Sequence, residues 1–173
     1  MSWRVISMLL LVGVLSTASA HGGEDSLQQE QISSGQVLLI SGIGALALWQ
    51  ATSAVISVRA DGFSPMMVAL AGYSSLVHLM LGLQDTLLLV GGFGLMVGLV
   101  ALVVLDLGKQ RHRLIQFAMG AGVLVMLIGY FASNHDLHAF AEDRLGITTK
   151  IAELAFLGLL YRSLFTAEKQ ARA

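Results

Sequence analysis

Five long apolar runs dominate this sequence of 173 residues and constrain its fold more than any other feature. They cover residues 36–58, 66–83, 86–105, 114–131 and 147–165. Each run has about 18 to 23 residues, close to the roughly 20 that a helix needs to cross a hydrocarbon core. Strands of a membrane barrel would alternate apolar and polar residues, and these runs do not alternate. The sequence therefore predicts an all-α integral membrane protein, a single bundle of five transmembrane helices within residues 36–165.

The charged residues are too few to cover a surface that faces water. They make up 12% of the chain, the mean hydropathy is +0.76, and 55% of the residues are hydrophobic. A soluble domain has about 25% charged residues. The net charge of −1 offers no basic field to attract nucleic acid. The absence of cysteine excludes disulfides, thiolate metal sites and iron–sulfur clusters. The expected partner of this surface is a lipid bilayer.

The first twenty residues have the features of a secretory signal peptide. Arg4 gives the start a positive charge, an apolar stretch follows, and residues 18–20 (Ala-Ser-Ala) satisfy the small-residue rule for cleavage. Cleavage after Ala20 makes His21 the first residue of the mature chain, which begins with a short polar tail over residues 21–35. If the signal peptide is retained instead, it adds a sixth helix.

Lysine and arginine are unevenly distributed between the connections, and this bias predicts the orientation. With the mature N-terminus exported, seven of these residues fall on the cytoplasmic side and two on the other side. The seven are Arg59, Lys109, Arg111, Arg113, Arg162, Lys169 and Arg172, and the two are Arg144 and Lys150. We therefore expect a plasma-membrane protein with an exoplasmic N-terminus and a cytoplasmic tail over residues 166–173.

The most polar segment, YFASNHDLHAFAEDRLG at residues 130–146, lies on the exoplasmic side in this orientation. If it is helical, His135, His138 and Glu142 share one face at positions i, i+3 and i+7. Two imidazoles and a carboxylate on one face can bind a divalent ion such as copper, zinc or nickel. An ordinary hydrated segment at the membrane interface can carry the same residues, and both interpretations stay open.

His78 and Glu153 are ionisable residues inside the apolar runs. His78 lies about two turns before the exoplasmic end of its run, with Asp85 at i+7 on roughly the same face if the helix extends that far. Ionisable side chains are costly inside a membrane and often mark a ligand site or a proton pathway. Glu153 either pairs with Lys150 at the helix entrance or turns inward at the depth of His78. The alternative for His78 is a neutral side chain satisfied by another helix.

His21 is a further possible metal ligand. After cleavage its imidazole stands beside a free α-amine, and these two nitrogens together chelate Cu(II), the divalent ion with the highest affinity in the series. A flexible polar tail is the alternative interpretation, because many exported proteins begin with one.

No short motif of an enzyme is found, so we expect no catalytic activity. The sequence has no glycine-rich phosphate loop, nucleophile elbow or zinc-protease helix. The signal peptide, the histidine at position 21 and the several spans resemble the nickel permeases that accompany hydrogenase and urease. The His-Pro and Gly-x-Asp-His signatures of that family are missing. The His-Gly start is similar to the copper-bearing subunit of particulate methane and ammonia monooxygenases over a few residues only, and neither likeness establishes a family.

Two hypotheses of function follow from these residues. The first is a membrane protein that binds or delivers divalent copper, zinc or nickel on its exoplasmic side. Its expected ligands are His135, His138, Glu142, His78, Asp85 and His21, with Glu153 as an intramembrane acid. The second is a non-catalytic accessory subunit of a larger membrane complex. Small residues at four-residue spacing support close helix packing, within the bundle or between copies of the chain.

Overall fold

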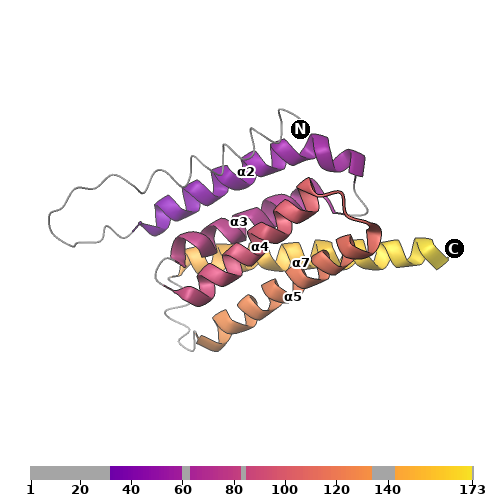
Figure 1. The fold of residues 1–173 in the computed structure, drawn as a ribbon. Coiled ribbons are helices and arrows are strands. Elements are labelled where there is room, and N and C mark those ends of the chain that lie inside the picture. Colours follow the sequence, from indigo (N-terminus) through magenta and orange to yellow (C-terminus); the bar gives the residue numbers. More distant parts are fainter. Residues whose placement is uncertain (1–31, 60–62, 83–84, 134–142, 173) are drawn as a thin grey trace. The chain divides into compact units, whose positions relative to one another are not determined.

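The computed structural model describes residues 32–59, 63–82, 85–133 and 143–172. This part of the chain contains five helices and no strand: α2 (Ser34–Arg59), α3 (Pro65–Leu81), α4 (Thr86–Val104), α5 (Lys109–Ser133) and α7 (Arg144–Arg172) (Figure 1). Each helix coincides with one of the predicted apolar runs, so the all-α class is confirmed. The predicted signal peptide, the polar tail up to residue 31 and the predicted helix at 135–142 lie outside the described residues.

Three of the described helices are long and apolar enough to cross a membrane. They are α2 over Ser34–Ser53, α4 over Thr86–Val104 and α5 over Lys109–Ala132. Helix α3 is apolar but has only 17 residues. Helix α7 contains Lys150, Glu153 and Arg162 and is not among the three. Three described helices that could cross a membrane are consistent with a membrane protein, and the predicted total of five spans is carried forward as a proposal.

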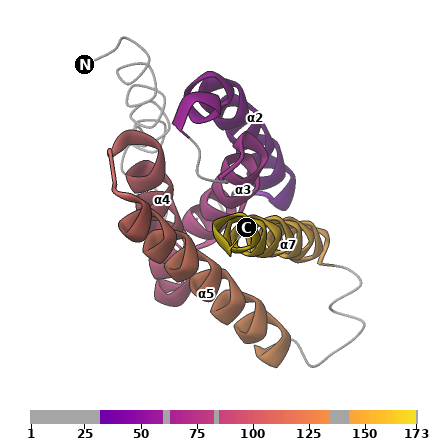
Figure 2. The same ribbon diagram turned by 90° about the vertical axis from the view of Figure 1, so that its right-hand side faces the viewer.

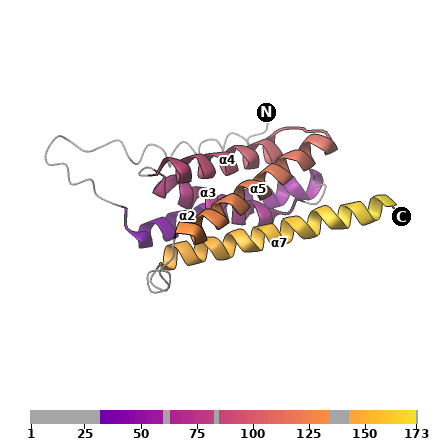
Figure 3. The same cartoon turned by 90° about the horizontal axis from the view of Figure 1, so that it is seen from below.

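Helix α3 is the centre of the unit formed by Ser34–Ala173. It packs against α2, α4 and α7, while α5 packs against α4 and α7. Figure 2, which looks nearly along the helices, shows α3 between these three neighbours. Consecutive helices alternate in direction (Figure 1), and Figure 3 shows α5 and α7 side by side. The C-terminal half of α3 and the N-terminal half of α7, which are far apart in sequence, thereby lie next to each other.

The starts of α3 and α4 follow from local chemistry. Ser64 caps α3, since its hydroxyl accepts a hydrogen bond from the backbone N–H of Met67 at 3.3 Å. Pro65 is the first helical residue, where its missing N–H is not needed. Asp85 caps α4 in the same way, with its carboxylate accepting from the N–H of Leu87 at 2.8 Å.

Helices α3 and α4 approach closely at a glycine. A Cβ atom on Gly92 would lie 2.8 Å from the backbone nitrogen of Leu79 and 2.9 Å from the carbonyl oxygen of Ser75. The hydroxyl of Ser75 donates a buried hydrogen bond of 2.7 Å to the carbonyl oxygen of Gly92. Only glycine leaves room for this contact, which fixes α4 against the half of α3 that carries His78.

Candidate functional site

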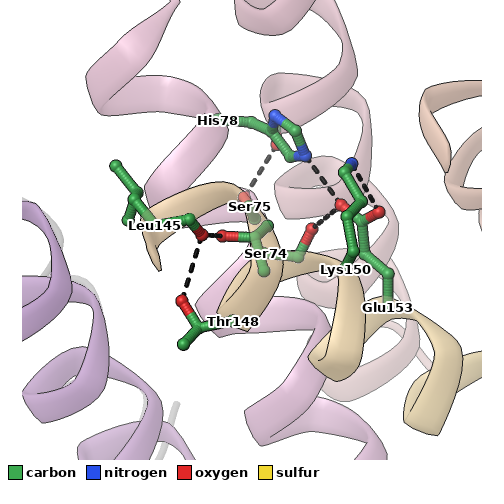
Figure 4. Close-up of polar contacts among 9 residues, drawn as sticks. Ser74, Ser75, His78, Leu145, Thr148, Lys150 and Glu153 are labelled. Atoms are coloured by element: carbon green, nitrogen blue, oxygen red, sulfur yellow. Dashed lines mark hydrogen bonds and ion pairs between the residues drawn. The ribbon is translucent and has the colours of Figure 1, made fainter. Parts of the chain in front are cut away.

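The carboxylate of Glu153 is the centre of a buried polar cluster between α3 and α7. Its oxygen Oε1 accepts from the hydroxyl of Ser74 at 2.8 Å and lies 2.7 Å from Nε2 of His78. Its other oxygen, Oε2, accepts from Nζ of Lys150 at 2.7 Å. Figure 4 shows the three side chains directed at the one carboxylate. The exposed fraction of Glu153 is 0%, so these contacts are made out of reach of solvent.

Helical spacing places the members of the cluster. Ser74 and His78 are four residues apart on α3, and Lys150 and Glu153 are three apart on α7, so each pair shares a face. The two outcomes that the sequence left open for Glu153 are both found. The side chain turns inward to His78, and it also pairs with Lys150, whose exposed fraction is 5%.

The positions of the protons in the cluster can be inferred from the charges of its side chains. Lys150 and Ser74 both donate to Glu153, which identifies the carboxylate as ionised and an acceptor. His78 must then donate through Nε2–H. Glutamate and lysine already cancel each other's charge, so a neutral imidazole keeps the buried cluster uncharged, whereas a protonated one would leave a net positive charge.

The second ring nitrogen of His78 has no partner in the part of the chain that the structure describes. Nδ1 is buried, and no described residue forms a hydrogen bond with it. In the neutral ring with its proton on Nε2, this atom carries a free lone pair. A buried lone pair of this kind can accept a proton or bind a metal ion.

Tyr130 extends the cluster from α5 towards the start of α7. Its ring lies under the ammonium group of Lys150, 5.1 Å from Nζ to the ring centroid. Its hydroxyl donates a hydrogen bond of 2.9 Å to Asp143, the residue before α7. Asp143 also accepts from the backbone N–H of Gly146 at 2.8 Å, which caps the helix. The residues on either side of the segment 134–142 are therefore connected to Lys150, and through it to Glu153.

The other ligands expected from the sequence are placed differently or are not described. Helix α3 ends at Leu81, so Asp85 is not on the same helix as His78, and its exposed carboxylate caps α4. The remaining four expected ligands, His21, His135, His138 and Glu142, lie outside the described residues. Within the part of the chain that the structure describes, no group of three or more histidine, aspartate or glutamate side chains is close enough to hold a metal ion.

Several members of the cluster were not singled out by sequence. Ser74 was missed, although its position four residues before His78 places it on the same helical face. Tyr130 and Asp143 were within the polar segment but were assigned no role. Gln116 on α5 is a further buried polar residue, 1% exposed, whose Nε2 has no partner among the described residues.

Comparison of the chain with protein-family models, with curated proteins and with solved structures found no match.

Proposed function

We propose that this protein is a small multi-pass membrane protein that binds a divalent metal ion of the copper, zinc or nickel type, with His78 as one ligand. The observation that carries the proposal is the orientation of His78: Nε2 faces the Glu153 carboxylate, and Nδ1 is buried with no hydrogen-bond partner among the described residues. A histidine that binds a metal commonly donates its other N–H to a carboxylate, which fixes the tautomer and the ring. In this proposal, Glu153 orients the ligand and does not itself bind the metal.

The proposal gives Lys150 a separate role. Its ammonium donates a hydrogen bond of 2.7 Å to Oε2 of Glu153, and its positive charge keeps the carboxylate ionised. The ionised carboxylate holds the proton of His78 on Nε2 and leaves Nδ1 as the metal-binding atom. A cation as close to Glu153 as Lys150 would repel a second cation bound to the same carboxylate, so the metal belongs on the Nδ1 side of the imidazole.

One nitrogen ligand is not a metal site, and the others proposed are His135, His138 and Glu142. A divalent zinc site takes four ligands, of which three come from the protein in open sites. The support for this set is the connection described above: Tyr130 and Asp143, which flank residues 134–142, contact each other, and Tyr130 contacts Lys150. The topology predicted from the lysine and arginine bias assigns both the end of α3 that carries His78 and this segment to the exoplasmic side, where delivery of a metal would occur.

The test is the metal content of the full-length protein purified in detergent and dialysed against Zn²⁺, Cu²⁺ or Ni²⁺. We expect about one bound ion per chain, lost in His78→Gln and in His138→Ala. The variant His78→Gln is chosen because the glutamine amide can still donate to Glu153 from the position of Nε2, while Nδ1 is removed. His112→Ala, which changes a histidine of α5 at the other end of that helix from Tyr130, is the matched control and should keep the metal.

The variant Glu153→Gln tests whether Glu153 only orients His78 or itself binds the metal ion. Loss of a carboxylate that orients a metal-binding histidine weakens metal affinity by about 10- to 100-fold without abolishing binding. Unchanged metal content in both His78→Gln and His138→Ala would contradict the metal proposal.

The accessory-subunit hypothesis is the second proposal, and one observation favours it. Glu153 already has three donors, Ser74, His78 and Lys150, so the cluster has the contacts of a structural clamp between α3 and α7. In that case the variants above would bind no less metal than the parent chain, and loss of His78 would instead lower the stability of the bundle.

A further inference from the structure

Helix α2 has two opposite faces with the same residue spacing. The buried face, which packs against α3, consists of Val37, Ser41, Gly44, Leu48 and Thr52. A second set begins two positions later, about 200° around the helix, and is exposed. We call it the outward stripe; it consists of Leu39, Ile43, Leu46 and Gln50. Its three apolar members are 63%, 60% and 62% exposed, and its four-three-four spacing is the spacing by which one helix packs along another.

Gln50 is the member of the outward stripe that lipid cannot satisfy. Its side chain is exposed, and no hydrogen bond of its amide is found within the described residues. Helix α2 continues for nine residues to Arg59, about 13 Å at a rise of 1.5 Å per residue. The apolar run predicted from the sequence continues from Gln50 to residue 58, about 12 Å along the helix, and the glutamine side chain is too short to cover that distance. An amide left unpaired in hydrocarbon is strongly unfavourable, and in membranes such side chains bond between helices.

A second copy of this chain can supply a hydrogen-bond partner for the side-chain amide of Gln50. Two copies have the same orientation in the membrane, so a two-fold axis along the membrane normal places each residue beside itself at the same depth. A glutamine amide carries both donors and an acceptor, so two of them can bond reciprocally. A lysine or a glutamate at this position would repel its own copy, whereas the neutral amide is self-complementary.

We propose that two copies of this chain associate in the membrane through the outward stripe of α2, with Gln50 bonded to the partner's Gln50. Leu39, Ile43 and Leu46 pack along the shared seam on the N-terminal side of the amide pair. A single polar residue among apolar ones fixes the register and number of the helices that associate. The association uses no residue of the His78–Glu153 cluster and does not depend on the metal proposal.

The chain contains no cysteine, which makes site-directed crosslinking a direct test. Ile43→Cys places one thiol on the outward stripe. Val97→Cys places one on the exposed face of α4, where the parent side chain is 51% exposed, and is the matched control. In native membranes treated with a short bifunctional thiol reagent, we expect a crosslinked species of twice the chain mass from Ile43→Cys, several-fold more abundant than from Val97→Cys.

Replacing Gln50 in the Ile43→Cys background tests the amide itself. We expect Gln50→Leu to weaken association by about three- to tenfold, because interhelical hydrogen bonds in membranes are individually modest. Gln50→Asn, which keeps a donor and an acceptor, should retain most of it. Since residue 50 points away from α3, neither change should unfold the monomer.

Three results would overturn the proposal. Equal crosslinking of the two cysteine variants would mean random collision, and an unchanged yield in Gln50→Leu would remove the role of the amide. Crosslinking of Ile43→Cys mainly to a protein of different mass would mean that the outward stripe binds another subunit and not a second copy.

Discussion

His78 on α3 and Glu153 on α7 are 75 residues apart in the chain, yet Nε2 of the histidine lies 2.7 Å from Oε1 of the glutamate in the interior of the helical unit. Their side chains are 5% and 0% exposed. Interactions of ionisable groups at such a depth are expensive to break, because each partner left behind is unsatisfied. The predictions below follow from this contact and from the packing around it.

Removal of the Glu153 charge should destabilise the protein strongly. Glu153→Gln leaves the ammonium of Lys150 buried without a counter-ion, and breaking a buried pair in this way costs about 3–5 kcal/mol. The measurement is the free energy of unfolding in detergent. The double variant Glu153→Gln with Lys150→Met removes both charges and should recover most of the loss. Equal stabilities of the single variant and the parent would show that the ion pair contributes nothing.

Gly92→Ala should separate α3 from α4. The added methyl group would meet backbone atoms of Leu79 and Ser75, which cannot move as a side chain can. Overpacking of this kind costs about 1–3 kcal/mol. Gly94→Ala is the control on the same helix, since a Cβ there meets nothing within 4 Å, and it should leave the melting temperature equal or higher. Identical melting temperatures for the two variants would contradict the close approach at Gly92.

Replacement of Gln116 by an apolar residue of similar length should stabilise the bundle. Its Nε2 is buried and unpartnered among the described residues, and an unsatisfied buried group costs about 1–3 kcal/mol. We expect Gln116→Met to raise the free energy of unfolding by about 1 kcal/mol. Gln110→Met, at an exposed position of the same helix, should change it little. A less stable Gln116→Met protein would show that the amide is satisfied.

Tyr130→Phe should weaken the start of α7. The change removes the hydrogen bond of 2.9 Å to Asp143 but keeps the ring beneath Lys150. The expected loss is about 1 kcal/mol, seen as a lower midpoint of thermal unfolding. Tyr73→Phe removes an exposed bond of 3.2 Å to Thr148 and should cost less, within about 0.5 kcal/mol. A larger effect at Tyr73 than at Tyr130 would reverse the expected order.

The orientation of the helices stays a prediction from the lysine and arginine bias. Reporter fusions after residue 110 and after residue 165 should both report a cytoplasmic location. Activity of an exoplasmic reporter at either junction would place His78 and the start of α7 on the opposite side of the membrane, and with them the proposed metal site.

The location of the helices could be predicted from the sequence, and their inward faces could not. The apolar runs and the similar depth of His78 and Glu153 were both accessible from spacing and topology. In lipid, however, apolar side chains cover both faces of a helix, so hydrophobic periodicity does not mark the buried one. On α2, Leu39 is 63% exposed and Val37 is 1% exposed, although both are aliphatic.

The cluster was predictable only in part for a related reason. The spacing of Lys150 and Glu153 is local and suggested their ion pair directly. Their contact with Ser74 and His78 depends on how α3 and α7 pack, which is set by residues far apart in sequence. Asp85 was expected on the same helical face as His78, seven residues away. That relation required α3 to continue to residue 85, but α3 ends at Leu81.

The central position of α3 has a consequence for the order in which the protein is made. Synthesis proceeds at about 5–20 residues per second, so the 75 residues from His78 to Glu153 take about 4–15 s. Throughout that interval the imidazole of His78 and the hydroxyl of Ser74 have no carboxylate to bond. A chain interrupted before α7 therefore carries an unfinished polar surface in its central helix, which a membrane protease can recognise. Pulse-chase labelling should therefore show chains that end at residue 143 degraded faster than the full chain.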